Sequence, residues 1–176
     1  MGFIFFSGSP RSIELAKAKY IVSSIPPFVA KIGLFVNPSR SAVEDCINDV
    51  GIDTLQFHGD ERPEFCDIFG LPWIKTISVD EKSNIAQSIA LYSNASAYLF
   101  DTKKSGSFGG TGEVFDWTLI PKNIGRPFIV AGGLREENVA EAIKIPDLYA
   151  VDVCSGVEQE KGKKSKMLMP VSYTHL

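Results

Sequence analysis

Short apolar segments alternate with amphipathic ones along the whole chain, and this pattern predicts strands and helices in turn. The apolar runs are rich in Ile, Val and Phe and are continuous, which is typical of strands buried on both faces of a parallel sheet. We expect seven such strands, at 2–6, 28–36, 54–58, 73–77, 97–100, 128–131 and 149–153.

Between these strands, apolar residues recur at the spacing of three and four positions that helices require. The expected helices are 12–24, 41–50, 63–69, 81–92 and 136–143, with a helical turn around Trp117. Strands that alternate with helices fit either a doubly wound open sheet or a (β/α)8 barrel. A complete barrel needs roughly 250 residues, so seven strands in 176 residues predict an α/β fold of the (β/α)8 TIM-barrel type that is incomplete.

Polar side chains collect where the predicted strands end. Arg11 follows the first strand, Gln56 and His58 close the third, Asp101 closes the fifth, and Asp152 lies near the end of the seventh. The two-residue period of a strand puts Gln56 and His58 on the same face. Active sites of parallel α/β folds form at the carboxyl ends of strands, so we expect these residues at one mouth.

Two glycine-containing loops follow the sixth and seventh strands, at Gly132-Gly133 and at Ser155-Gly156. Backbone amides in such loops bind anions, and barrels often hold phosphate between the loops after strands 7 and 8. If one strand is missing at the front of the chain, the loops at Gly132-Gly133 and Ser155-Gly156 correspond to the barrel loops after strands 7 and 8. The alternative is that each glycine serves only a turn or a helix end.

Composition narrows the classes of partner. The net charge is −3, and the basic clusters at 103–104 and 161–166 fit solvated loops as well as phosphate attraction. We therefore expect neither nucleic acid nor membrane as a partner, since no apolar run approaches the roughly 20 residues that span a bilayer. The three widely spaced cysteines favour a reducing compartment over disulfides and suggest no metal site.

Six motifs, taken together, resemble those of the phosphoribosylanthranilate isomerase family over residues 2–166. They are GFIFFSGSPRSI (2–13), KIGLFVN (31–37), LQFHGDE (55–61), FDTKKSGSFGGTGEVFDW (100–117), AGGLREENVAEAI (131–143) and VDVCSGVEQEKGKK (151–164). The resemblance implies a cytoplasmic enzyme of tryptophan biosynthesis, a monomer or homodimer, that acts on a phosphorylated small molecule. Its reaction is the Amadori rearrangement of N-(5-phosphoribosyl)anthranilate to 1-(2-carboxyphenylamino)-1-deoxyribulose 5-phosphate, without metal or organic cofactor.

The resemblance also implies roles for individual residues. Asp101 is the expected general acid, because a carboxyl group in an apolar strand-end pocket can hold its proton near neutral pH; the alternative is an aspartate that caps the following loop. Arg11 is expected to bind the anthranilate carboxylate, and Gln56 and His58 to contact substrate. Asp152 either binds ribose hydroxyls and orients loops or is a buried carboxylate satisfied by amides. The expected phosphate-binding residues are Gly110, Gly132, Gly133, Ser155 and Gly156.

The chain departs from the family pattern at both ends. The family begins with a strand that carries a Lys-Ile-Cys-Gly type motif and a helix, and we expect this chain to be a fragment without that unit, its general-base cysteine or the last helix. The expected division is a truncated barrel domain at 1–166 and a non-family tail at 167–176, for which one interpretation is an artefact. Cys46 and Cys66 fit helix packing. Cys154 is a conceivable replacement base, although the family usually has a small residue such as Ser there.

The expected function is therefore an isomerase whose activity is impaired in this chain. Two alternatives are an inactive phosphosugar-binding remnant and another phosphate-binding barrel enzyme, such as a thiamine-phosphate synthase or a ribulose-phosphate epimerase. The FHGDE and FDW motifs argue against the latter.

Overall fold

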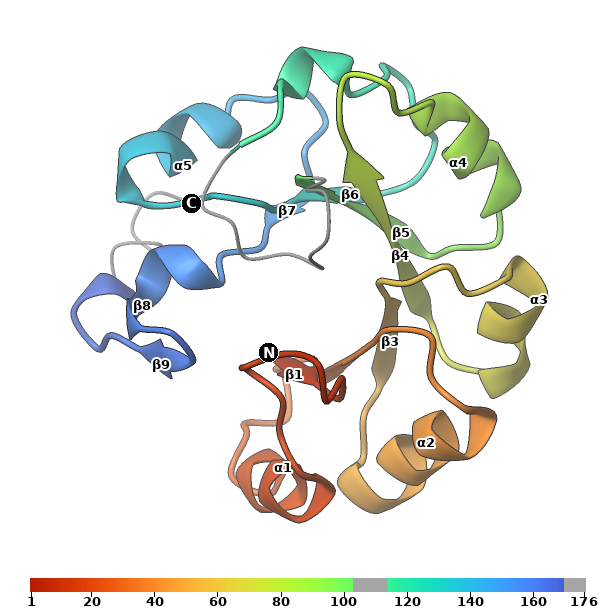
Figure 1. The fold of residues 1–176 in the computed structure, drawn as a ribbon, viewed down its shortest axis with the longest axis vertical. Coiled ribbons are helices and arrows are strands. Elements are labelled where there is room, and N and C mark those ends of the chain that lie inside the picture. The colour runs from red at the N-terminus through yellow and green to blue at the C-terminus, as the bar shows by residue number, and fades with distance from the viewer. Residues whose placement is uncertain (103–113, 170–176) are drawn as a thin grey trace. The chain divides into compact units, whose positions relative to one another are not determined.

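Seven parallel strands, β1 to β7, follow one another in chain order in one sheet, with helices between them (Figure 1). This computed structural model describes residues 1–102 and 114–169. The described chain forms two compact units, Met1–Lys75 with Asn94–Ser96 and Thr76–Ser93 with Ala97–Leu176. The fold is thus α/β of the TIM-barrel type with seven strands, as the alternation of elements predicted.

The first unit consists of three strand–helix pairs and the first half of β4. Its elements are β1 (Gly2–Ile4), α1 (Leu15–Val22), β2 (Ile32–Phe35), α2 (Arg40–Asp45), the π-helical turn Cys46–Val50, β3 (Thr54–Phe57), α3 (Pro63–Cys66) and the 3-10 turn Asp67–Phe69. The helices α1, α2 and α3 lie on the same side of these strands (Figure 1). These helices therefore cover one face of the strands.

Aromatic side chains build the core of this unit. The rings of Phe5 and Phe35 are 5.6 Å apart, and those of Phe35 and Phe57 are 6.2 Å apart. Phe57 also contacts Phe65 and Trp73, at 5.9 Å and 6.3 Å between ring centroids. The parallel register pairs Phe35 directly with Phe57. Large rings on neighbouring strands thus fix β2 against β3.

The second unit continues the pattern from the second half of β4. Its elements are β4 (Trp73–Val79), α4 (Ile85–Leu91), β5 (Ala97–Thr102), the 3-10 turn Trp117–Leu119, β6 (Phe128–Val130), α5 (Glu136–Ala142), β7 (Ala150–Val151), the 3-10 turn Ser155–Val157, β8 (Glu158–Glu160) and β9 (Lys163–Lys164). Tyr98, Phe100 and Val130 are its most deeply buried large side chains. Phe100 pairs with Val130 in the parallel register of β5 and β6, so the core again lies along paired strands.

Several predicted boundaries were wrong. The segment before Ile32 is not part of β2, because Pro26 begins a turn in which the amide of Val29 donates to the carbonyl of Pro26 at 3.1 Å. The strand β5 runs two residues beyond the expected end, so Asp101 lies within it. One of the two interpretations of the basic segment 161–166 was a solvated loop, but Lys163 and Lys164 form β9 and pair with β8.

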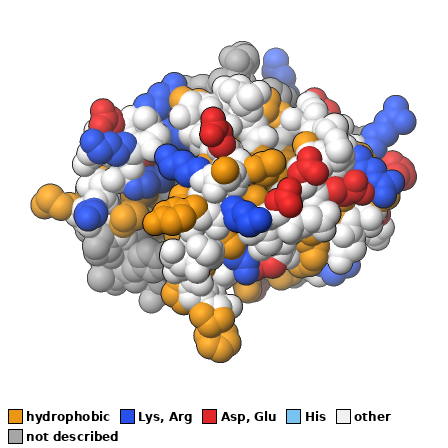
Figure 2. Space-filling view, turned by 90° about the horizontal axis from the view of Figure 1, so that it is seen from below, with side chains coloured by type: hydrophobic (Ala, Val, Ile, Leu, Met, Phe, Trp, Pro, Cys, Tyr) orange, Lys and Arg blue, Asp and Glu red, His pale blue; other side chains and the backbone are white. Residues whose placement is uncertain are grey.

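The surface carries side chains of every kind. On the face drawn in Figure 2, apolar side chains lie among both positive and negative ones. Tyr20 and Phe28 are among the most exposed large apolar residues, at 77% and 101%. Single exposed apolar residues are normal on protein surfaces. Among the described residues, no helix is long and apolar enough to cross a membrane.

Candidate functional site

Asp101 and Gly132 lie against each other in the second unit. Asp101 is the last residue but one of β5 and only 6% exposed, and its Oδ1 accepts a hydrogen bond from the amide of Thr102 at 2.8 Å. A Cβ atom added to Gly132 would lie 2.6 Å from this Oδ1 and 2.5 Å from the Thr102 hydroxyl. The absence of a side chain at Gly132 therefore lets the loop after β6 approach the carboxyl group directly.

The loop after β6 owes its shape to its two glycines and to Asn138. Gly132 and Gly133 both have positive φ angles, 80° and 67°, which glycine adopts at no steric cost. The Asn138 side chain accepts from the amide of Arg135 at 2.9 Å and donates to the carbonyl of Gly133 at 3.0 Å. One side chain from α5 thus caps its own helix and fixes the loop in front of it.

The two glycine loops meet. Gly156 is packed so closely on the loop after β6 that an added Cβ atom would lie 1.9 Å from the carbonyl oxygen of Leu134. Ser155 begins the 3-10 turn that contains Gly156. Just before it, the amide of Asp152 donates to the carbonyl of Val130 at 2.9 Å, while its side chain is exposed. The expectation of neighbouring glycine loops is confirmed. The alternative of a buried Asp152 carboxylate is wrong, because Asp152 is exposed.

The remaining expected site residues, apart from Gly110, belong to the first unit. Gln56 lies in β3 and is 6% exposed, and His58 follows the strand and is half-buried. Arg11 is half-buried in the loop after β1, where its amide donates to the Ser9 hydroxyl at 3.2 Å. Gly110 lies outside the described residues. The convergence of these groups with Asp101 on one mouth stays a prediction.

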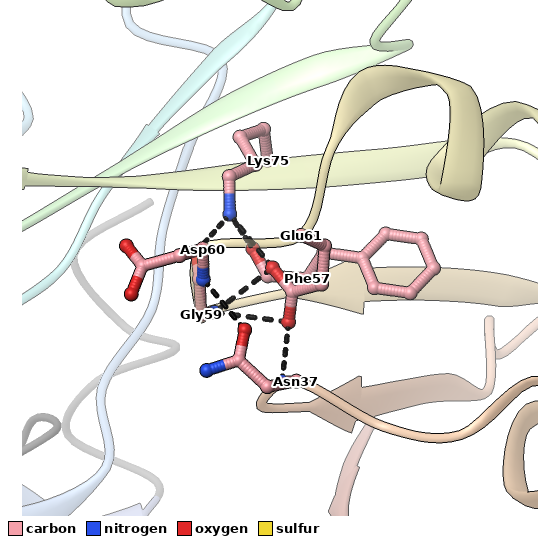
Figure 3. A network of polar contacts seen from close by, with 6 residues as sticks. All are labelled: Asn37, Phe57, Gly59, Asp60, Glu61 and Lys75. Carbon is pink, nitrogen blue, oxygen red and sulfur yellow. Dashed lines mark hydrogen bonds and ion pairs between the residues drawn. The ribbon is translucent and has the colours of Figure 1, made fainter.

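A buried lysine in β4 was not expected from the sequence. The Lys75 side chain is 3% exposed, and its ammonium group contacts three oxygen atoms. It donates to the carbonyls of Phe57 and Gly59 at 3.2 Å and 2.5 Å and to Oε2 of Glu61 at 2.9 Å (Figure 3). An ammonium has three N–H donors, so these contacts give each of them an acceptor.

Glu61 extends this network to the end of β2. Its side chain is 2% exposed, and its carboxylate accepts from the amides of Asn37 at 2.8 Å and Gly59 at 3.0 Å (Figure 3). The Asn37 side chain in turn accepts from the amide of Asp60 at 2.8 Å. The signal in the sequence was a lysine inside the apolar strand WIKTI, because a buried charge requires a partner.

The cysteines fall into two classes. Cys46 and Cys66 are buried, and burial raises the pKa of each thiol to about 12. They pack as expected and do not supply a thiolate near neutral pH. Cys154 is half-buried after β7, with its Sγ 3.4 Å from Nζ of Lys164. In the described ranges, no three His, Cys, Asp or Glu side chains form a group that could hold a metal ion.

A family model described as N-(5'phosphoribosyl)anthranilate (PRA) isomerase matches residues 1–171. The chain belongs to this family. A PRA isomerase of Stutzerimonas stutzeri is 49% identical over 164 residues, which are 93% of this chain and 79% of that relative. One of Pseudomonas syringae pv. tomato is 46% identical and aligns with 99% of this chain and 86% of its own length. Matches that cover this much of the chain give no support to the expectation that it is a fragment.

Solved PRA isomerase structures have the same fold. The Thermotoga maritima enzyme superposes with a TM-score of 0.90 at 32% identity, covering 99% of this chain and 85% of that one. A PRA isomerase in complex with reduced 1-(o-carboxyphenylamino)-1-deoxyribulose 5-phosphate superposes with a TM-score of 0.86 at 31% identity, covering 99% and 84%. A third structure, of monomers made from the dimeric Thermotoga maritima enzyme, has a TM-score of 0.85 at 29% identity, covering 99% and 84%.

Proposed function

We propose that this chain is a cytoplasmic enzyme that isomerises N-(5'-phosphoribosyl)anthranilate in tryptophan biosynthesis, as a monomer or homodimer. Family membership supports the reaction, because PRA isomerases are its curated relatives. The observation that carries the proposal is the buried Asp101 carboxyl group against Gly132. Glycine loops of this kind present backbone amides that can hold an anion, and Asp101 lies directly beside this one.

In the proposed reaction, Asp101 acts as the general acid. Its proton goes to the ribose ring oxygen as the bond between that oxygen and C1 breaks, which leaves an open-chain Schiff base. A base then removes the C2 proton, and tautomerisation of the resulting enol gives the 1-deoxyribulose product. The hydrogen bond from the Thr102 amide to Oδ1 limits rotation of the carboxyl group and so supports a fixed direction of proton transfer.

The other expected residues bind the substrate in this proposal. Arg11 pairs with the anthranilate carboxylate, Gln56 and His58 contact the substrate, and Asp152 binds ribose hydroxyls. The exposure of Asp152 is consistent with a ligand contact. The phosphate is held by the amides of Gly110, Gly132, Gly133, Ser155 and Gly156. The close packing of Gly156 on Leu134 supports a single anion site shared by the two described loops.

The test is loss of substrate fluorescence during turnover. Asp101→Asn should lower kcat by about 10²–10⁴-fold, because general acid catalysis contributes that much, while affinity for the reduced product analogue is retained. The matched control is Asp49→Asn, at an exposed position in the first unit. Undiminished turnover by Asp101→Asn would show that the acid is another group.

The same assay tests two expectations: that the activity is weak, and that the general base is missing. Cys154→Ser should leave kcat unchanged, because the Cys154 thiol is not the base in this proposal. Turnover by the 176-residue chain that matches its Stutzerimonas stutzeri relative would contradict impairment. Binding of the product analogue without any turnover would instead support the inactive phosphosugar-binding alternative.

A further inference from the structure

We infer that the buried Lys75–Glu61 pair is a positioning device that holds His58 in place for the ligand. This inference rests on the proposed function, in which His58 contacts the substrate. The pair itself touches no reacting atom in this account. It acts through the backbone between Phe57 and Asp60, and Lys75 and Glu61 are therefore positioning residues rather than catalytic ones.

Lys75 holds both sides of His58. Its ammonium donates to the carbonyl of Phe57, the residue before His58, and to that of Gly59, the residue after it. The His58 amide donates to the carbonyl of Phe35 at 2.9 Å. The backbone on either side of the imidazole is thus tied to two neighbouring strands. A cation on a flexible stem could not do this alone, but the 2.9 Å contact with Glu61 fixes it.

Glu61 holds the same segment from the opposite side. It accepts from the amide of Gly59, so Gly59 is bound through its carbonyl by Lys75 and through its amide by Glu61 (Figure 3). Glu61 also accepts from Asn37, at the end of β2. A Cβ atom added to Gly59 would lie 2.5 Å from Oδ1 of Asn37. The segments that follow β2 and β3 therefore meet Lys75 of β4 in one network around this glycine.

The burial of two charges indicates that the network has a role beyond stabilising the fold. Removing two charges from water is costly, and apolar residues of similar volume are often equally stabilising in their place. A merely structural pair could therefore be replaced by neutral side chains without harm to ligand binding. A positioning pair could not, because the direction of its hydrogen bonds fixes the loop. The two roles make different predictions for variants that remain folded.

The experiment compares Glu61→Gln/Lys75→Met and Asn37→Gly with Lys31→Met. The double variant removes both charges and leaves none unpaired. Asn37→Gly removes the side-chain contacts to Asp60 and Gly59 but leaves the charged pair, and glycine suits the φ of 47° at that position. Lys31→Met is the matched control, because it breaks a pair with Asp53 in the same unit, at 2.8 Å, before β2 rather than after it.

Two readouts are taken on folded protein. One is the NMR signal of the His58 ring, which a His175→Gln variant assigns because the chain has two histidines. The other is affinity for the reduced product analogue by calorimetry. We expect the double variant to shift and broaden the His58 signal and to weaken affinity by about tenfold, since small misplacements are costly. Asn37→Gly should change both in the same direction by less, and Lys31→Met should change neither.

The outcomes separate the two proposals. An unchanged His58 signal and unchanged affinity in folded Asn37→Gly and the folded double variant would overturn the positioning role. If the double variant does not fold, Asn37→Gly alone decides the matter in the same way. Failure of the parent chain to bind the analogue would count against the proposed function, while the His58 signal of the unliganded variants still tests the network.

Discussion

At the scale of single residues, two positions of the candidate site require glycine because a side chain there would not fit. Gly132 and Gly156 each occupy positions where a methyl group would meet backbone or polar atoms within 2.6 Å. The sequence located these glycines by their place after two strands. It could not show that they approach Asp101 and Leu134, because such contacts depend on the packing of β6 against its neighbours.

The close packing around Gly132 makes Gly132→Ala an informative variant. The added methyl would contact Asp101 and Thr102 at 2.5–2.7 Å, and the φ angle of 80° disfavours any L side chain. The control Gly125→Ala has a similar φ of 74° but nothing within 4 Å. Gly125→Ala should cost about 1–2 kcal/mol, and Gly132→Ala about 1–3 kcal/mol more from overpacking. Urea unfolding measures both, and equal losses would show that the loop moves freely away from Asp101.

Thiol reactivity gives a second prediction at this scale. Burial holds the pKa of Cys46 and Cys66 near 12, so both remain protonated between pH 7 and pH 9 and react slowly. Cys154 is half-buried and should react first. We expect an aromatic disulfide reagent at pH 8 to label one thiol in the folded chain and three in denaturant. Rapid labelling of three thiols under native conditions would contradict the burial of Cys46 and Cys66.

At the scale of elements, one ion pair lies before β2 and β3 and another beyond their carboxyl ends. At the amino ends, Lys31 pairs with Asp53, whose side chain is 42% exposed. At the carboxyl ends, Asn37 and Glu61 belong to the buried network with Lys75. The ion pair at the amino ends is thus partly exposed to solvent, and the pair at the carboxyl ends is buried. We expect the two pairs to contribute differently to the free energy of unfolding.

Asp53→Asn and Glu61→Gln measure that difference. Partial burial works against ionisation of Asp53, but hydrogen bonds and charge from Lys31 hold its pKa below the usual 3.8. Its contribution is therefore present above that pH and is lost as pH falls through the lower folded value. Asp53→Asn should cost under about 1 kcal/mol at pH 7, and progressively less as pH falls below 3.8. Glu61→Gln should cost about 3–5 kcal/mol at pH 7, because it leaves the Lys75 charge buried without its partner.

Unfolding free energies from urea titrations at pH 7 and pH 2 test this contrast. Arg40→Met is a further control, because it breaks an exposed pair with Glu44 on α2 and should have little effect. Equal losses for Asp53→Asn and Glu61→Gln at pH 7 would show that the buried pair is solvated in solution.

The elements were predictable to different degrees for physical reasons. Continuous apolar runs such as WIKTI and YLF are found as β4 and β5, because burial on two faces leaves an unmistakable pattern. Helix ends were less predictable: Ser41–Val50 was expected to be one helix, but α2 ends at Asp45 and continues as a π-helical turn. The Lys75–Glu61 pair lay beyond prediction, because no local pattern says which distant side chain a buried charge meets.

At the scale of the whole molecule, the chain divides into two compact units within the strand β4. The buried network belongs to the first unit, which ends its long segment at Lys75, and the glycine loops with Asp101 belong to the second. Units with separate cores can open separately in native proteins. The free energy of local unfolding can therefore differ between the buried network and the glycine loops.

Hydrogen exchange followed by mass spectrometry tests whether the units open independently. Lys75→Met should increase exchange over 32–61, which contains the Phe57 and Gly59 carbonyls that Lys75 binds, and less over 128–142. Gly132→Ala should produce the reverse pattern, because its clash lies in the second unit. An equal increase over both segments in either variant would show that the chain unfolds as one cooperative body.

The enclosure of Lys75 has a consequence for the chemistry of its amine. Open-chain sugars carry carbonyl groups that condense with free lysine amines, and the product of the proposed reaction is such an open-chain phosphosugar. The Lys75 side chain is 3% exposed, and its ammonium group donates to three oxygen atoms and so has no lone pair for addition to a carbonyl. The exposed lysines of the surface should become glycated in prolonged contact with ribose 5-phosphate, while Lys75 is spared.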